Sequence, residues 1–196
     1  MNFKEMFKHI PGEKYPQKRT YKGRTIFLMD KFPVKNQETL RFSIEKVNSK
    51  YPQGFYLNIE DGYIKTNGSK ATPTRKESII LFWEDSNVLN AKNIEVQIFT
   101  KKNSIFIGNI LEDTIYEEMV VDGTKPALES NKTIKYPNGK KIVCHVNSEQ
   151  YAIGKCNGFA MYSEDIPNGK HYFCNDGDED EDFDDIIFTV KRVNQV

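Results

Sequence analysis

The sequence has little of what several large protein classes require. Its 196 residues include three cysteines, one tryptophan and three histidines, so neither a disulfide framework nor a histidine-based metal site is indicated. Lysine plus arginine and aspartate plus glutamate are equal at 28 each, and a chain without net charge lacks a general electrostatic attraction for nucleic acid. No apolar run approaches the roughly 18 residues of a membrane span. We therefore expect no nucleic-acid partner and no membrane span.

The chain also lacks a continuous apolar stretch after Met1, which a secretory signal would need. We expect a cytoplasmic location by default, with leaderless export as the alternative. In a reducing compartment, Cys144, Cys156 and Cys174 are expected to be small core residues. Cys144 and Cys174 each end a segment that follows Pro-Asn-Gly. These two would approach each other only if their strands were neighbours, so the sequence leaves open whether any of the cysteines pair.

Good helix formers are scarce as well. The chain has 7 leucines and 5 alanines against 19 isoleucines and 11 valines, and β-branched side chains pack well on a pleated sheet but lose rotamer freedom in a helix. The 17 asparagines and 12 glycines supply residues for turns that need a positive φ. The composition therefore predicts an all-β fold.

Strand patterns occur at short intervals from residue 39 onward. Thr39–Val47 alternates apolar and polar residues, as a half-buried strand does, whereas Ser78–Trp83 is apolar after its first residue, as in a sandwich interior. Asp61-Gly62 and Lys102-Asn103 predict hairpins. Further strands are predicted at 55–59, 63–66, 93–99, 104–111, 115–121, 132–136, 140–146, 158–162, 170–174 and 186–193. The expected fold is an antiparallel β-sandwich, jelly-roll-like, with an open barrel as the alternative.

The N-terminal part of the chain has a different pattern. Phe3, Met6, Phe7 and Ile10 follow helical spacing, which predicts a short amphipathic helix over residues 2–10. The basic, proline-punctuated stretch that follows contains one predicted strand, Thr25–Met29. We therefore expect an N-terminal helix and basic arm at residues 1–37 and a β-sandwich domain at 38–196. The helix is expected to dock either on its own domain or on a second copy of the chain, giving a homo-oligomer.

Residues 175–185 form the most acidic segment. Eight of these eleven residues are acidic, and the segment joins Tyr172–Cys174 to the apolar run Ile186–Val190. Two carboxylates about 5 Å apart repel by roughly 3 kcal/mol at an effective dielectric of 20, so a short loop between core strands needs a compensating charge. Calcium binds six to eight oxygens of this kind, and magnesium has stricter geometry. The segment is not an EF-hand, because a strand follows it. We predict a calcium site; a solvated acidic loop and a patch for a basic partner are the alternatives.

The end of this segment resembles a known pattern. Asn-Asp-Gly, further acids, and then Asp-Phe-Asp-Asp-Ile-Ile-Phe at 182–188 is similar to the closing motif of bacterial calcium-binding β-sandwich domains, including lectin and adhesin modules. That family often has an asparagine where this chain has Asp184. The resemblance implies calcium and a possible contact of the ion with sugar hydroxyls. Its implied metal ligands are Asn175, Asp176, Asp178, Asp182, Asp184 and Asp185. Glu179 and Glu181 are expected to face solvent, and Glu164 or Asp165 to reach the same site if their strand neighbours the last one.

No motif for catalysis is present. The sequence contains no Gly-x-Ser-x-Gly elbow, phosphate-binding glycine loop or His-Glu-x-x-His, and His145 directly follows Cys144, so the two would lie on opposite faces of a strand. We expect a non-enzymatic calcium-binding interaction module for a carbohydrate or protein ligand. One alternative is a structural subunit that self-assembles into a filament or lattice through its N-terminal arm. The other is an inhibitor or immunity-type protein that uses the acidic loop.

Overall fold

The computed structural model describes residues 3–7, 13, 16–49, 53–66, 69–71, 77–83, 93–112, 132–135, 141–146, 159–176 and 180–193. Across these ranges the chain forms two antiparallel sheets and one short helix, so the predicted all-β class is confirmed. The strand predicted at 115–121 and the candidate ligand Asp178 lie outside the described residues, as do Glu179 and Cys156.

The larger sheet has nine strands in the described part of the chain. Its hydrogen-bonded order is β1-β2-β13-β14-β15-β4-β9-β6-β7, and every pairing is antiparallel. The bounds are β1 Lys18–Tyr21, β2 Arg24–Phe27, β4 Thr39–Val47, β6 Gly62–Thr66, β7 Ser69–Ala71, β9 Ile94–Thr100, β13 Ala160–Ile166, β14 Gly169–Asn175 and β15 Ile186–Arg192.

The smaller sheet has six described strands. Five follow the order β11-β12-β10-β5-β8, and β3 pairs with β10 beside this path. The bounds are β3 Asp30–Pro33, β5 Gln53–Glu60, β8 Glu77–Trp83, β10 Ser104–Glu112, β11 Lys132–Lys135 and β12 Lys141–Val146.

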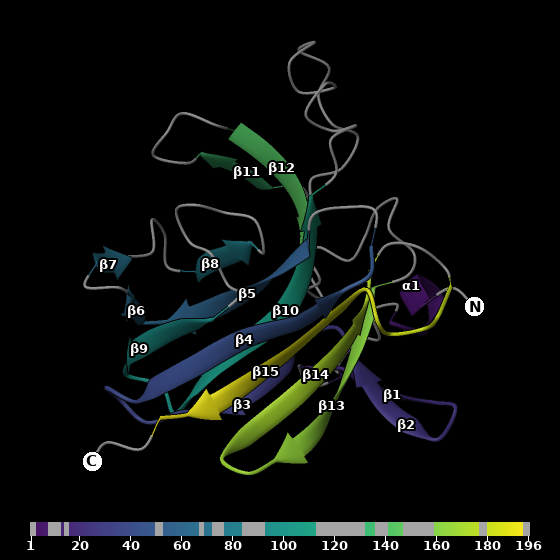
Figure 1. Cartoon of the computed structure of the whole chain (residues 1–196), viewed down its shortest axis with the longest axis horizontal. Helices are drawn as coiled ribbons and strands as arrows, with labels where there is room; N and C mark the ends of the chain where they lie inside the picture. The colour runs from purple at the N-terminus through teal and green to yellow at the C-terminus, as the bar shows by residue number, and fades with distance from the viewer. Residues whose placement is uncertain are drawn as a thin grey trace.

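The two sheets pack against each other in a β-sandwich-like arrangement. Figure 1 shows β10 passing behind β4 and β15. Aromatic rings join the layers: Phe55 of β5 stacks on Phe42 of β4, with ring centroids 4.7 Å apart, and on Phe188 of β15 at 5.2 Å. All three side chains are fully buried in a cluster that draws residues from both sheets. Burial of such rings and of the surrounding aliphatic side chains supplies the main stabilisation of the fold.

Both hairpins predicted from turn residues are wrong, and the reason is the same in each case. Asp61 separates β5 of the smaller sheet from β6 of the larger one, and 101–103 separate β9 of the larger sheet from β10 of the smaller one. The chain therefore crosses between the layers at these turns. A turn residue with positive φ, such as Asp61 at 49°, reverses or redirects the chain without specifying which strand it will pair with.

Two other turns do form hairpins. Lys22 and Gly23 both have positive φ, at 46° and 77°, as the two-residue turn between β1 and β2 requires. Asn168, at φ 61°, follows Pro167 in the turn between β13 and β14, which is the Pro-then-Asn order of a type II turn.

Cys174 is buried and unpaired in β14, while Cys144 lies in β12 of the other sheet.

The predicted N-terminal arm contributes strands to both sheets. Among the described residues helix α1 covers Phe3–Met6; residues 2 and 8–10 of the predicted helix lie outside them. The prediction of a single strand between residues 11 and 38 is wrong, since β1, β2 and β3 all lie there and pair within the two sheets. The domain boundary between residues 37 and 38 itself stays a prediction. Among the described residues there is no helix with the length and hydrophobicity needed to cross a bilayer.

A buried polar contact also links the layers. Asp30 of β3 is 4% exposed, and its Oδ2 accepts hydrogen bonds from Lys170 Nζ at 2.7 Å and from the Tyr172 hydroxyl at 2.8 Å, both on β14. Burial and the neighbouring Asp30 raise the pKa of Tyr172 well above its ordinary value. Tyr172 therefore stays protonated and continues to donate at neutral pH.

We expect Asp30→Ala to lower the free energy of unfolding by about 2–4 kcal/mol, because it leaves a buried hydroxyl and an ammonium group without their acceptor. Urea denaturation followed by circular dichroism measures the change. The matched control is Asp165→Ala, an exposed residue opposite Lys170 in β13, which should stay within about 0.5 kcal/mol of the wild type. Equal stability of the two variants would contradict a stabilising role for the contact.

Candidate metal centre

The acidic loop connects two neighbouring antiparallel strands. Cys174 of β14 pairs with Ile186 of β15, so the two ends of the loop are held side by side. The Asp176 backbone N–H donates to Asp185 Oδ2 at 2.8 Å, and the Asn48 N–H donates to the Asp185 carbonyl at 3.0 Å. The loop therefore has a fixed base, and its acidic side chains cannot separate freely.

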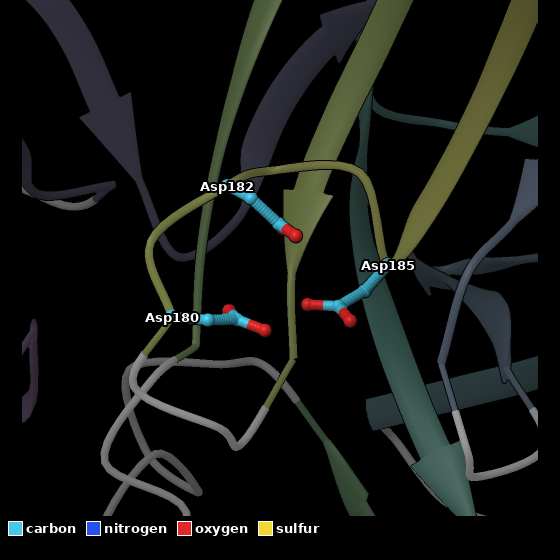
Figure 2. Close-up of side chains that lie close together, drawn as sticks. All are labelled: Asp180, Asp182 and Asp185. Atoms are coloured by element: carbon cyan, nitrogen blue, oxygen red, sulfur yellow. The ribbon is translucent and has the colours of Figure 1, made fainter.

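Alternate residues of the loop point in different directions. Glu181 and Phe183 both have φ 61°, a left-handed conformation that bulky residues rarely adopt. The Phe183 side chain is buried in a cluster with Phe3, Tyr21 and Tyr162, which holds the backbone in this conformation. Figure 2 shows Asp180, Asp182 and Asp185 pointing toward a common centre.

These three carboxylates form the candidate centre. Each offers an oxygen that lies within 4.8 Å of the others; Asp180 and Asp182 are exposed, and Asp185 is buried. At that separation each pair of charges repels by about 3 kcal/mol at an effective dielectric of 20, and by under ~1 kcal/mol in open water. The cluster can hold a metal ion, because a cation replaces this repulsion with attraction. A hard cation such as calcium accepts carboxylate oxygens and completes its shell with carbonyl groups or water.

Without a cation, the surroundings of the cluster disfavour the charged form of two of its carboxylates. Burial raises the pKa of Asp185 to about 7; the neighbouring carboxylates of Asp176, Asp180 and Asp182 add to this, while the hydrogen bond from the Asp176 N–H opposes it. Burial also raises the pKa of Asp182. Near neutral pH, Asp185 is therefore partly protonated in the absence of a cation.

The other residues predicted as ligands have different partners. Asp184 accepts a 2.9 Å hydrogen bond from Asn48 Nδ2 and forms an ion pair with Lys46, and these contacts lower the pKa of Asp184. Asp176 is 1% exposed, and its Oδ2 accepts hydrogen bonds from Ser49 Oγ at 2.6 Å and Gln53 Nε2 at 3.2 Å. These two aspartates thus attach the loop to the strands around it.

Asn175 also holds the loop in place. Its Oδ1 accepts a 3.3 Å hydrogen bond from the Phe183 N–H, and its carbonyl accepts one of 3.1 Å from Asn109 Nδ2 of the opposite sheet. Of the six residues predicted as ligands, the structure therefore brings only Asp182 and Asp185 to the common centre, and Asp178 lies outside the described part of the chain.

Two further expectations about acids are wrong. Glu181 does not face solvent: its side chain is 15% exposed and contacts the Tyr21 hydroxyl and Lys22 Nζ. Glu164 and Asp165 cannot reach the loop, because they pair with His171 and Lys170 near the opposite end of β14. The expectation held only if their strand neighboured the last one, and among the described strands β13 pairs with β2 and β14 and not with β15.

Asp180 is the member of the cluster that sequence reasoning missed. Within a run of eight acids, composition cannot say which side chains converge. The distinguishing signal is the side-chain direction, which depends on the positive φ of Glu181 and Phe183 and on the burial of Phe183. The only sequence cue was the single aromatic residue inside the acidic run.

Comparisons with protein-family models, with curated proteins and with solved structures give no match. The chain's function is therefore inferred from its own residues.

The raised pKa of Asp185 gives a pH prediction with a definite sign. An unfolded aspartate has a pKa of about 3.9, so between about pH 4 and 7 the unfolded chain releases a proton that the folded chain keeps. In the presence of chelator, this group makes stability fall as the pH rises through that window. Asp185→Asn keeps an acceptor for the Asp176 N–H without the charge. We expect it to match the wild type at pH 4 and to exceed it by about 2–4 kcal/mol at pH 8.

Urea denaturation in chelator at both pH values measures this difference. An Asp185→Asn variant no more stable than the wild type at pH 8 would show that the buried carboxylate is not destabilising.

Proposed function

We propose that the protein is a non-enzymatic, calcium-binding β-sandwich interaction module whose ion is bound by Asp180, Asp182 and Asp185. The observation that carries this proposal is the convergence of three carboxylate oxygens within 4.8 Å on a loop fixed at both ends. Calcium suits the site better than magnesium, because an irregular loop with several carboxylates matches its variable geometry and magnesium demands a near-ideal octahedron.

The exposure of the site supports a binding role. Asp180 and Asp182 are exposed while Asp185 is buried, so a bound ion would contact the buried Asp185 on its protein side and remain accessible to solvent on the other. An accessible calcium ion can exchange a water molecule for a ligand oxygen, as from a sugar hydroxyl or a protein carboxylate. We propose a carbohydrate or protein ligand on this basis, in line with the resemblance of the 182–188 segment to lectin and adhesin modules.

The self-assembly alternative has less support. It requires the apolar stripe of the N-terminal helix to dock on another copy, but Phe3 is fully buried and Phe7 is 7% exposed within their own chain. The inhibitor alternative needs only the exposed acids. It differs from the main proposal in one respect: its binding would survive a chelator.

Calcium should stabilise the folded protein. At free calcium about 100 times the dissociation constant, binding to the folded state alone adds about 2.7 kcal/mol, measured as a rise in the thermal unfolding midpoint over the value in chelator. We expect Asp180→Asn and Asp182→Asn to remove this rise, since each deletes one of the three charges.

Asp184→Asn is the matched control. Asp184 lies in the same acidic run, but its carboxylate pairs with Lys46 and Asn48, so this variant should keep the calcium-dependent rise. If Asp184→Asn lost the rise and Asp180→Asn kept it, the assignment of ligands would be wrong. Absence of any rise in the wild type would remove the proposed function.

A glycan array tests the ligand class. We expect bound glycans in calcium that are lost in chelator and lost by the Asp182→Asn variant. Glycan binding that persists in chelator would contradict an ion-mediated contact, and binding of a basic protein under the same conditions would favour the inhibitor alternative.

A further inference from the structure

The N-terminal segment, defined here as residues 3–7, lies directly against the acidic loop. The Phe3 ring is fully buried, with its centroid 5.5 Å from that of Phe183 and 5.1 Å from that of Tyr21, which it meets edge to face at 89°. Figure 1 shows α1 beside the loop that leads into β15. The only aromatic residue of the acidic loop is therefore packed on Phe3 of the N-terminal segment.

A second contact joins the same two parts. The Tyr21 hydroxyl donates a hydrogen bond to Glu181 Oε2, and Lys22 Nζ lies 3.1 Å from the same oxygen. Successive side chains of the loop therefore have different surroundings. Glu181 contacts Tyr21 and Lys22, and Phe183 packs on Phe3. Asp180 and Asp182 face the candidate centre. Because these residues are adjacent along the backbone, one set cannot move without the other.

The N-terminal segment is itself held by Arg19. Its Nε donates a 2.7 Å hydrogen bond to the Met6 carbonyl, and its guanidinium lies 5.7 Å from the centroid of the Phe7 ring. Arg19 precedes Tyr21 in β1. The strand that holds the loop therefore also holds the segment, and the three parts form one continuous set of contacts.

We propose that calcium binding and docking of the N-terminal segment are energetically coupled through Phe183 and Tyr21, which act as positioning residues for the metal centre. This inference rests on the proposed function. Without a cation, repulsion among the three carboxylates opposes the loop arrangement that packs Phe183 on Phe3. A cation draws the loop together and favours the docked segment. Coupling is reciprocal, so loss of docking weakens calcium binding by the same factor.

Two measurements on the full-length protein test the coupling. Calorimetry should show that Phe3→Ala weakens calcium binding at least 5-fold, the lower end of typical coupling. Hydrogen exchange of the wild type should slow at the amides of residues 3–7 by a similar factor when calcium is saturating. Phe3 contributes no oxygen ligand, so a loss of affinity can arise only through the packing.

The controls separate coupling from general destabilisation. Tyr63→Ala removes a ring that stacks on Phe99 at 4.5 Å near the other edge of the same sheet, and its calcium affinity should stay within 2-fold of the wild type. Tyr21→Phe keeps the ring and removes only the hydroxyl that donates to Glu181. It is the second variant should Phe3→Ala fail to fold, and it should weaken binding by less than Phe3→Ala.

The outcomes distinguish this inference from the proposed function. A wild type that binds no calcium overturns both. A wild type that binds calcium with the same affinity as Phe3→Ala and Tyr21→Phe, and whose amides at residues 3–7 exchange at the same rate with and without calcium, leaves the function standing and overturns the coupling.

Discussion

The antiparallel pairing of β14 with β15 is the constraint on which the rest of the site depends. It brings the ends of a strongly acidic loop together beside the core, where Cys174 and Ile186 are fully buried. In an open chain the same acids would spread into water with little cost. Here Asp185 lies at the buried base of the loop, and burial raises its pKa because it disfavours the charged carboxylate. A bound cation offsets that cost more completely than a proton does, since it serves three carboxylates at once.

The described acids of the loop fall into two groups, those that contact residues outside the loop and those that converge on the candidate centre. Asp176 and Asp184 hydrogen-bond to Ser49 and Asn48 outside the loop, and Glu181 contacts Tyr21. Among the described acids of the loop, Asp180, Asp182 and Asp185 are the ones that converge on the centre. The neutral polar residues also contribute, because Asn109 and Gln53 of the smaller sheet both donate to the loop end of β14. Buried polar groups that satisfy one another in this way fix a single arrangement of the backbone. The conformation of the loop is therefore set by contacts with residues of both sheets.

Much of the fold could be predicted from the sequence, and the failures have identifiable physical causes. The alternation in Thr39–Val47 matches β4 in both bounds, because period-2 burial is a local property. Pairing partners are not local. Asp61 and Asn103 are turn residues, but the chain crosses between the two sheets there, and β3 is held by pairing with the distant β10 despite its weak local pattern. The acidic run located the candidate site, yet the choice of Asp180 over Asp184 depends on Lys46, which pairs with Asp184, and on Phe3 and Tyr21, which pack on Phe183. All three are remote in sequence from the acidic run.

The most direct test of the central claim is an anomalous difference map from crystals grown in calcium. We expect a peak between Asp180, Asp182 and Asp185, with carboxylate oxygens of all three at the 2.3–2.6 Å typical of calcium. A map at good resolution with no anomalous peak there, and with the three side chains turned outward to separate water molecules, would contradict it.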